Sequence, residues 1–360
     1  ENFNDSYKKL EALIKKNMLN AREHAGVWSL PNGSDYYKHR LKIYTTTNLS
    51  ADEIHNLGLE LVDEIQSEIK SILASEGYDI NRPLEDIFVE LNEDPRFLFE
   101  DSDEGRQAIL DEYTRINEET YKILPDYFNE LPQAKVVVKR IPIFSEKSAA
   151  GGYYQGSSLD GSRPAAWYAN LYDIKATQKF GMPALSFHEA VPGHHLQIAL
   201  NQENTNQTLW NKFGYTTSAF TEGWALYAER LAIEAGLVTD PYDMIGSLQS
   251  ELFRAARLVV DTGIHSKKWT REKAIKYMMD NAGQVRSAAE SEIERYIVWP
   301  AQATAYMVGR IKILELREKA KNQLGNRFNI KDFHSAVLMN GVLPLTVLEA
   351  VIDKYIAENS

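Results

Sequence analysis

The sequence predicts a mainly α-helical fold with one small β-sheet. Apolar side chains recur at helical spacing over long stretches of the 360 residues, most clearly over residues 50–72 and from Pro183 nearly to the end. Only residues 135–172 combine short runs of β-branched and aromatic side chains with glycine-rich segments, a pattern typical of short strands and loops. We therefore expect helices over most of the chain and a sheet in its middle.

The first predicted helix opens with a capping box, in which Ser50 is followed three residues later by Glu53. In this motif the serine and glutamate side chains bond to each other's backbone N–H groups, which satisfies two donors of the first turn. The apolar positions that follow are Ile54, Leu57, Leu61, Ile65, Ile69 and Ile72. Residues 103–130 form a second candidate helix, and we expect Pro125 to kink it or end it early because proline lacks the backbone donor.

The predicted sheet contains three short strands, at residues 136–138, 141–144 and 165–171, with loops at 151–154 and 156–158. Residues 166–171 lie shortly before a histidine-rich segment. They are a candidate exposed edge to which an extended substrate adds as a further strand, and a plain structural strand is the alternative. Beyond the sheet, the clearest helices are expected at residues 269–282, 301–316 and 345–357.

Length and composition limit the possible classes. We expect an N-terminal helical part (1–134) and a second part (135–360) with the sheet and a helical core, together one continuous domain around a cleft. The net charge of −11 argues against a nucleic-acid partner, which requires basic surfaces. No apolar run approaches the roughly 20 residues needed to span a membrane. The absence of cysteine excludes disulfides, thiolate metal ligands and a cysteine nucleophile.

The most informative segment is the octapeptide His188–His195, with the sequence HEAVPGHH. It holds three of the eight histidines of the chain and Glu189, in an otherwise apolar stretch. Such groups destabilise an apolar helix unless they are paired or bound to a metal. Imidazole nitrogens bind Zn²⁺, and a neighbouring carboxylate can take a proton from a water that the metal activates. The segment therefore predicts a zinc site with Glu189 as general base; purely structural histidines are the alternative.

The spacing of the histidines differs from the common HExxH motif, in which the two ligands lie at i and i+4 on one helix face. Relative to His188, the candidates lie at i+6 and i+7. Position i+7 returns to the same face about 10 Å further along a regular helix, too far for N–Zn bonds of about 2.0–2.1 Å. Pro192 and Gly193 favour a kink or bulge that brings His194 to the metal. His195 is the alternative ligand or a neighbour that faces the substrate.

A third ligand is expected from the next helical segment, residues 221–231. Glu222 and Glu229 are seven residues apart, so both can face the histidines from successive turns. Glu222 is the expected ligand, and Glu229 a carboxylate behind the ligands or a salt-bridge partner. Both could also be solvated surface charges, but a carboxylate among so many apolar neighbours favours a buried partner.

These segments resemble a bacterial domain-of-unknown-function family whose members carry HExxPGHH followed by a TEGWALYAE-like stretch. The resemblance covers nearly the whole chain and includes residues 44–47, 53–58, 160–164, 187–197, 257–265, 269–274, 296–309 and 341–345. That family is similar to carboxypeptidase Taq and the thimet oligopeptidase group, which are helical zinc peptidases. The resemblance implies a zincin-like, gluzincin-type metallopeptidase fold, Zn²⁺ as cofactor, and a peptide substrate cut near its C-terminus.

Family members usually have a longer helical N-terminal portion, whereas this chain begins at Glu1 without Met. We therefore expect a processed or excised chain that lacks part of its substrate cleft. On this expectation a missing signal peptide is uninformative, and a periplasmic, secreted or cytoplasmic location stays open, as does the oligomeric state.

Further residues are candidates for the chemistry. The oxyanion formed in amide hydrolysis requires a hydrogen-bond donor besides the metal, and Tyr296, Tyr306 and His265 could each supply one or simply pack. Arg163 could pair with a substrate carboxylate or lock its own loop with Asp160. The other candidates for substrate binding are Tyr168, Asn170 and Arg257, with Arg310 as a weaker one. The remaining histidines, His24, His39, His55 and His334, are expected to be structural or at the surface.

The function that these patterns predict is zinc-dependent hydrolysis of peptide bonds. The alternatives are hydrolysis of another amide and a non-catalytic binding protein that contains a metal. Glu189 favours an enzyme, because a structural zinc normally has four protein ligands and needs no base.

Overall fold

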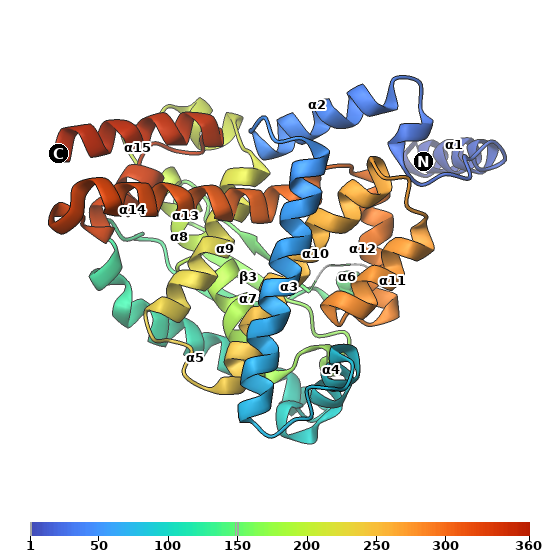
Figure 1. Cartoon of the computed structure of the whole chain (residues 1–360), viewed down its shortest axis with the longest axis horizontal. Helices are drawn as coiled ribbons and strands as arrows, with labels where there is room; N and C mark the ends of the chain where they lie inside the picture. The colour runs from blue at the N-terminus through green and yellow to red at the C-terminus, as the bar shows by residue number, and fades with distance from the viewer. Residues whose placement is uncertain (1, 148, 150) are drawn as a thin grey trace.

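Helices make up most of the computed structural model, which describes residues 2–147, 149 and 151–360 (Figure 1). The helices are α1 (Asn2–Met18), α2 (Gly33–Thr45), α3 (Ala51–Ser75), α4 (Leu84–Glu93), α5 (Asp103–Tyr127), α6 (Ile143–Glu146), α7 (Met182–Glu189), α8 (His194–Glu203), α9 (Ser218–Glu234), α10 (Pro241–His265), α11 (Arg271–Ala282), α12 (Arg286–Val298), α13 (Ala305–Leu324), α14 (Ile330–Leu338) and α15 (Leu345–Asn359). The strands are β1 (Val136–Arg140), β2 (Gly152–Gln155) and β3 (Ala165–Ala169). The prediction of a mainly helical protein with a small sheet is confirmed.

The first helix predicted from the capping box is α3, which packs along α10 (Figure 1). The side chain of Ser50 accepts a hydrogen bond from the backbone N–H of Glu53 at 3.2 Å, and Glu53 Oε2 accepts one from the backbone N–H of Ser50 at 2.8 Å. The apolar stripe of α3 is buried against α10, with Ile54, Ile65 and Ile69 almost inaccessible. Local sequence signals therefore predicted both the start and the buried face of this helix.

The other predicted helices form with shifted ends. Helix α5 ends at Tyr127 with Pro125 in its last turn, which is earlier than residue 130, as expected for a proline at this place. Helix α11 begins at Arg271, because the side chain of Thr270 caps it by accepting from the N–H of Lys273. Helix α13 begins only at Ala305, after a 3₁₀ turn, η6 (Gln302–Thr304).

The sheet has the order β1-β3-β2, with β1 parallel and β2 antiparallel to β3. Two predictions about this region are wrong. Residues 141–144 are not a strand, because Pro142 precedes the short helix α6 and its carbonyl accepts from the N–H of Ser145 at 2.8 Å. Residues 151–154 are not a loop, because all but Gly151 belong to β2, where Tyr154 pairs with Trp167. Pairing with β3 decides this strand in spite of its glycines.

The predicted exposed edge at residues 166–171 is also wrong. Strand β3 is the central strand and has a partner on each side, so its backbone groups are not open to a further strand. The edge strand that packs against α7 is β2. An added strand would therefore pair with an outer strand, β1 or β2, and not with β3; of these two, β2 is the one beside α7.

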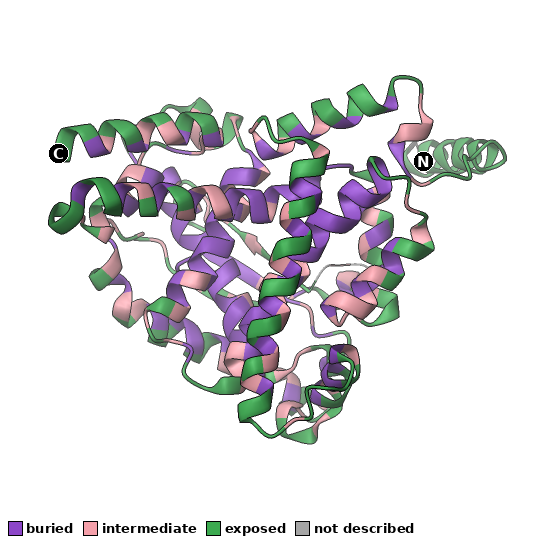
Figure 2. Cartoon of the chain, viewed as in Figure 1, coloured by how far each residue is buried: buried purple, intermediate pink, exposed green. Residues whose placement is uncertain are grey.

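The interior of the molecule is formed by α7, α9 and α10, whose residues are buried on nearly all sides (Figure 2). One apolar cluster extends from Val27 to Ile356 and so contains residues of both predicted parts; a smaller cluster surrounds Trp167 beside the sheet. The division at residue 134 stays a prediction. Helix α1 is exposed from Phe3 to Met18 and projects from the body (Figure 2).

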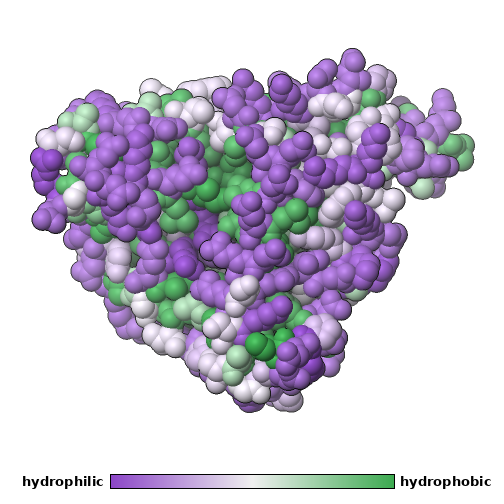
Figure 3. Space-filling model, viewed as in Figure 1, coloured by the Kyte–Doolittle hydropathy of each residue, from purple (hydrophilic) through white to green (hydrophobic). Residues whose placement is uncertain are grey.

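Polar side chains cover most of the face shown in Figure 3, and apolar ones gather around a depression in its centre. Within the described part of the chain, no helix combines the length and the apolar character needed to cross a membrane. Glu1, on which the expectation of a processed or excised chain rests, lies outside the described residues.

Candidate metal centre

The histidine-rich octapeptide is divided between two helices. Helix α7 ends at Glu189, residues 190–193 turn the chain, and α8 begins at His194. The distortion expected at Pro192 and Gly193 is thus a complete break rather than a bulge within one helix. Gly193 lies so close to the end of α7 that a Cβ there would be 2.0 Å from the carbonyl oxygen of His188. The indole N–H of Trp224 donates to the carbonyl of Pro192 at 2.9 Å and fixes the turn against α9.

This turn brings His194 beside His188, and Glu222 faces both. The two imidazole rings are 4.7 Å apart between centroids and nearly perpendicular. Glu222 Oε2 lies 3.4 Å from Nε2 of His188 and 3.3 Å from Nε2 of His194. A tetrahedral zinc site with bonds of about 2.0–2.1 Å has ligand atoms about 3.3–3.4 Å apart. Both distances from the carboxylate to an imidazole match this spacing, and one ligand atom from each of the three residues lies within 4.8 Å of the other two.

The position of Glu222 depends on a close crossing of helices α9 and α13. A Cβ on Gly223 would lie 2.5 Å from Cα of Gly309, so the two backbones are nearly in contact. On its other side α9 packs against α7. The crossing therefore fixes the position of α9 relative to α7, and with it the position of Glu222 relative to the two histidines.

Glu229 lies where the sequence analysis expected it, behind the cluster. Its Oε1 accepts a hydrogen bond from Nδ1 of His188 at 2.7 Å, and its Oε2 accepts one from the hydroxyl of Ser250 at 2.8 Å. With Nδ1 used as a donor, Nε2 of His188 is the nitrogen that faces the cluster, and it would offer its lone pair to a metal once its proton is lost. Burial by itself lowers the pKa of His188, but Glu222 and Glu229 outweigh it and raise that pKa to about 9.

The alternative ligand, His195, points away from the cluster. Its Nε2 donates to the carbonyl of Ala134 at 2.9 Å, and its Nδ1 accepts from the hydroxyl of Tyr154 at 3.0 Å. Adjacent residues of a helix point about 100° apart, so His194 and His195 cannot both face one ion. Burial lowers the pKa of His195 to about 4, so this imidazole is neutral and links α8 to β2.

Glu189 lies in the wall of a cavity of about 740 Å³, next to the three candidate ligands. Within the described residues its carboxylate accepts no hydrogen bond. Burial raises the pKa of the nearby Tyr113, and the carboxylate of Glu189 adds to this effect. The carboxylate is therefore buried, beside the cluster and open to the cavity. The same cavity is lined by Tyr153 and Tyr154 of β2, by Phe253, Arg254 and Arg257 of α10, and by Glu292 and Tyr306.

Of the three candidate oxyanion donors, only Tyr306 lines this cavity. Burial raises its pKa, and the nearby charge of Glu222 adds to the effect, so the phenol stays protonated. Tyr296 is buried behind the wall, where its hydroxyl donates to Glu292 at 2.5 Å. His265 lies outside the cavity: Nδ1 accepts from the N–H of Val27 at 3.2 Å and Nε2 donates to the carbonyl of Tyr296 at 3.0 Å. The structure thus does not bring His265 and Tyr296 to the cluster.

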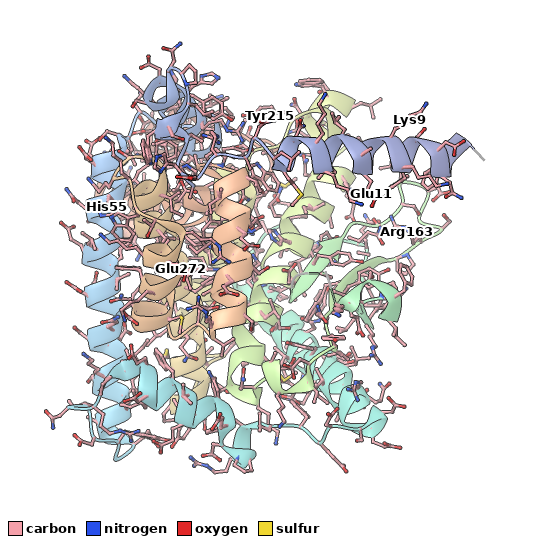
Figure 4. All side chains as sticks on the ribbon, turned by 90° about the vertical axis from the view of Figure 1, so that its right-hand side faces the viewer. Lys9, Glu11, His55, Arg163, Tyr215 and Glu272 are labelled. Carbon is pink, nitrogen blue, oxygen red and sulfur yellow. The ribbon has the colours of Figure 1, made fainter. Side chains whose placement is uncertain are left out.

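Of the candidate substrate-binding residues, Arg257 lines the cavity and the others do not. Arg163 is exposed on its loop, at the opposite edge of the molecule from His55 (Figure 4). Tyr168 stacks on Tyr153 with ring centroids 4.9 Å apart. The side-chain amide of Asn170 donates to the carbonyls of residues 146 and 149, so it orders the preceding loop.

The remaining candidates have structural partners. Arg310 forms a salt bridge with Glu251 at 2.6 Å. His55 bonds with the hydroxyl of Thr262 at 2.7 Å, and His334 with that of Tyr227, also at 2.7 Å. His24 and His39 are exposed, as expected.

The sequence analysis missed Ser250, Phe253 and Arg254 on helix α10, and Glu292 on α12. Ser250, Phe253, Arg254 and Arg257 lie at i, i+3, i+4 and i+7, so one face of α10 presents all four. That spacing could have been noticed. The pairing of Arg257 with Glu292 could not, because it joins two helices that are separated in sequence.

The solved structures that are similar to this chain include two bacterial proteins. A crystal structure from Colwellia psychrerythraea, described as a "putative lipoprotein", has 41% identity and a TM-score of 0.96, covering 98% of this chain and 60% of its own. A second, from Shewanella oneidensis, described as a "putative lipoprotein of unknown function", has 21% identity and a TM-score of 0.79, covering 97% of this chain and 64% of its own. This chain thus spans less than two thirds of either protein, and the second likeness shows the fold alone.

No curated protein matches this chain. The similarity to carboxypeptidase Taq and thimet oligopeptidase, which the motifs implied, stays a prediction. The resemblance to a bacterial domain-of-unknown-function family is confirmed, because the model of that family matches residues 1–352. The chain belongs to the family described as bacterial protein of unknown function (DUF885).

Proposed function

We propose that this protein is a zinc-dependent hydrolase of peptide bonds. The observation that carries the proposal is the spacing of His188, His194 and Glu222, whose ligand atoms all lie within 4.8 Å of one another in a cavity wall that also contains Glu189. Three protein ligands leave one position of a tetrahedral ion for water or substrate, which is the pattern of catalytic rather than structural zinc.

A bound zinc ion would supply a Lewis acid that polarises a water and the substrate carbonyl. Glu189 would take a proton from the attacking water and pass it to the amine that leaves. The hydroxyl of Tyr306 would donate a hydrogen bond to the oxyanion. Glu229 would hold His188 in the tautomer and orientation that the reaction needs.

A peptide is the substrate that the cavity favours. Edge strand β2 lines the cavity with residues Gly152, Tyr153 and Tyr154, and an extended chain could add to it through backbone hydrogen bonds. Such pairing recognises any peptide backbone, so it supports a peptidase over a hydrolase of small amides.

The Colwellia protein is described as a putative lipoprotein, which favours a periplasmic or secreted location over a cytoplasmic one for this chain. Cell fractionation would test this location.

The test compares the wild type with Glu189→Gln, which keeps the shape of the side chain but removes the base. Both proteins are loaded with zinc, their metal content is measured, and cleavage of a peptide mixture with free and blocked termini is followed by mass spectrometry. We expect equal zinc content and a rate about 10²–10⁴-fold lower for the variant. The exposed Glu60→Gln on α3 is the matched control and should behave as the wild type.

Equal cleavage by the wild type and Glu189→Gln would identify a contaminating protease and remove the support for the proposal. No cleavage by zinc-loaded wild type would favour the non-catalytic binding protein instead.

A further inference from the structure

Two arginines of α10 line the cavity that contains the candidate ligands, and they lie near the carboxylate of Glu292 or the hydroxyl of Ser250. Glu292 Oε2 accepts from Arg257 at 3.0 Å and from Arg295 at 2.9 Å, so two guanidinium groups share one carboxylate. Arg254, one turn before Arg257 on α10, forms no ion pair within the described residues and bonds instead to the backbone and hydroxyl of Ser250. Arg254 and Arg257 both line the cavity. Around Glu292, the two guanidinium groups of Arg257 and Arg295 exceed the single carboxylate by one charge, which an anionic ligand would balance.

Arg257 has an unused hydrogen-bond donor. Its Nε donates to the hydroxyl of Tyr296 at 2.8 Å and Nη2 to Glu292, but Nη1 has no partner among the described residues. The residue is only 6% exposed, and its guanidinium lies 4.2 Å from the ring centroid of Phe253 and 4.6 Å from that of Tyr306. A buried charged donor without an acceptor is costly, whereas a ligand that supplies the acceptor gains a charge-assisted hydrogen bond.

This donor lies close to the candidate metal ligands. The ring of Tyr306 packs on the guanidinium of Arg257. The charge of Glu222 acts on the hydroxyl of Tyr306, so this tyrosine lies between Arg257 and the candidate ligand Glu222. A ligand that reaches the metal ligands and Arg257 together must carry a carboxylate a short distance from the group that reacts. In a peptide, the α-carboxylate of the last residue lies one residue beyond the last peptide bond.

We propose that Arg257, assisted by Arg254, binds the free α-carboxylate of a peptide C-terminus and makes the enzyme a carboxypeptidase. This inference rests on the proposed function and names its substrate class. The planar fork of a guanidinium suits a carboxylate better than a lysine ammonium does, because it can donate two parallel hydrogen bonds. A carboxylate could also come from the side chain of an Asp or Glu at the end of the substrate. The experiment therefore separates a C-terminal carboxylate from a side-chain carboxylate.

The binding test uses zinc-loaded Glu189→Gln, which does not turn over its ligands. Titration calorimetry measures three acetylated tripeptides: one with a C-terminal Gln and a free carboxylate, the same peptide as the amide, and an amide that ends in Glu. We expect the free acid to bind about 10–100-fold more tightly than its amide, as expected for charge-assisted hydrogen bonds. The Glu amide should bind like the Gln amide. Equal affinity of acid and amide would overturn the proposal, and a preference for the Glu amide over the Gln amide would assign the site to acidic side chains.

The variants Arg257→Lys and Arg254→Gln, made in the Glu189→Gln background, should each reduce the preference for the acid about tenfold or more. Arg271→Lys, which lies outside the cavity on α11, is the matched control and should keep it. Circular dichroism and zinc content check that the variants fold. If Arg257→Lys does not fold, Arg254→Gln and the comparison of acid with amide still decide the question.

The two proposals fail separately. Hydrolysis of blocked and free peptides at equal rates would remove the carboxylate site and leave the hydrolase. A preference for the acid without any cleavage by wild type would leave the carboxylate site and remove the hydrolase.

Discussion

His188 and His265 are both buried in the last turn of a helix, and both ring nitrogens of each have partners, yet the partners of the two residues differ in charge. His188 has carboxylate partners, Glu229 on Nδ1 and Glu222 facing Nε2. His265 has backbone partners, the N–H of Val27 and the carbonyl of Tyr296. Burial and residue type do not distinguish them. The chemistry of the partners does, because two anions around one imidazole create a place for a cation.

The difference also shows in the protonation of buried histidines. Glu222 and Glu229 raise the pKa of His188 to about 9 in spite of burial. Burial lowers the pKa of His265, although Asp261 acts against it, and lowers that of His334 to about 4. A buried histidine whose hydrogen-bond partners are neutral is thus a packing group, whereas two carboxylates next to His188 favour its charged form.

The largest expected effect is the loss of the metal when a candidate ligand is removed. His188→Ala and Glu222→Ala should each weaken zinc binding by several kcal/mol, roughly a thousandfold or more, because a site with three protein ligands has none to spare. His265→Ala should retain one zinc per chain. Metal analysis after dialysis against a zinc buffer measures this, and retention of zinc by both ligand variants would rule out the assignment.

A second prediction separates the neighbours His194 and His195. His194→Ala should lose zinc to the same extent as His188→Ala, whereas His195→Ala should keep it, because its ring bonds to Ala134 and Tyr154. Competition with a chromophoric chelator gives both affinities. The reverse result would mean that the helix break places position i+7 on the metal instead.

The third prediction concerns His334, whose pKa in the folded protein lies below the unfolded value of about 6.5. Its contribution to stability is complete above about pH 6.5 and is lost as the pH falls through 4, because the unfolded chain binds the proton more readily. The shift to about 4 corresponds to about 3 kcal/mol. Urea unfolding of wild type and His334→Gln between pH 4 and 8 should show the difference shrinking toward acid.

For His188 in the metal-free protein the sign is opposite. Its folded pKa of about 9 lies above the unfolded value, so its contribution is complete below about pH 6.5 and is lost as the pH rises through 9. Urea unfolding of metal-free His188→Gln between pH 6 and 10 tests this. The same pH trend for His188 and His334 would remove the contrast between the two kinds of histidine.

The smallest expected effect is that of Glu229→Gln. It keeps a hydrogen-bond acceptor for Nδ1 of His188 but removes the charge, and zinc affinity should fall about 10–100-fold, as is typical for partners of metal-bound histidines. Glu234→Gln, on the same helix but paired with Arg317, is the control and should bind zinc as the wild type does. Unchanged affinity in Glu229→Gln would show that Glu229 only packs.

Much of the candidate site could be predicted because its signals are local. Glu222 and Glu229 are seven residues apart in one helix, so helical geometry alone places both on one face. Pro192 and Gly193 mark the break between α7 and α8 for equally local reasons. The choice of His194 over His195 also follows from that break, although the sequence left both open.

The parts that could not be predicted depend on contacts between distant segments. Strand β2 forms at glycine-containing residues because β3 lies beside it, and β3 loses its expected edge because β1 and β2 flank it. Tyr296 and His265 looked as suitable as Tyr306 for binding an oxyanion until the packing of α10 and α12 turned them away from the cavity.

By itself, the sequence determined that this protein is mainly helical, because this follows from the periodicity of its apolar side chains. It also showed that histidines and a glutamate of suitable spacing are available for a metal, because proline and glycine limit the backbone between the histidines. Only the tertiary structure decided that His188, His194 and Glu222 meet, with Glu189 and the unpaired donor of Arg257 in one cavity. The physical reason is that the direction of a side chain is set locally, whereas its neighbours are set by how the helices pack, as at the crossing of Gly223 and Gly309.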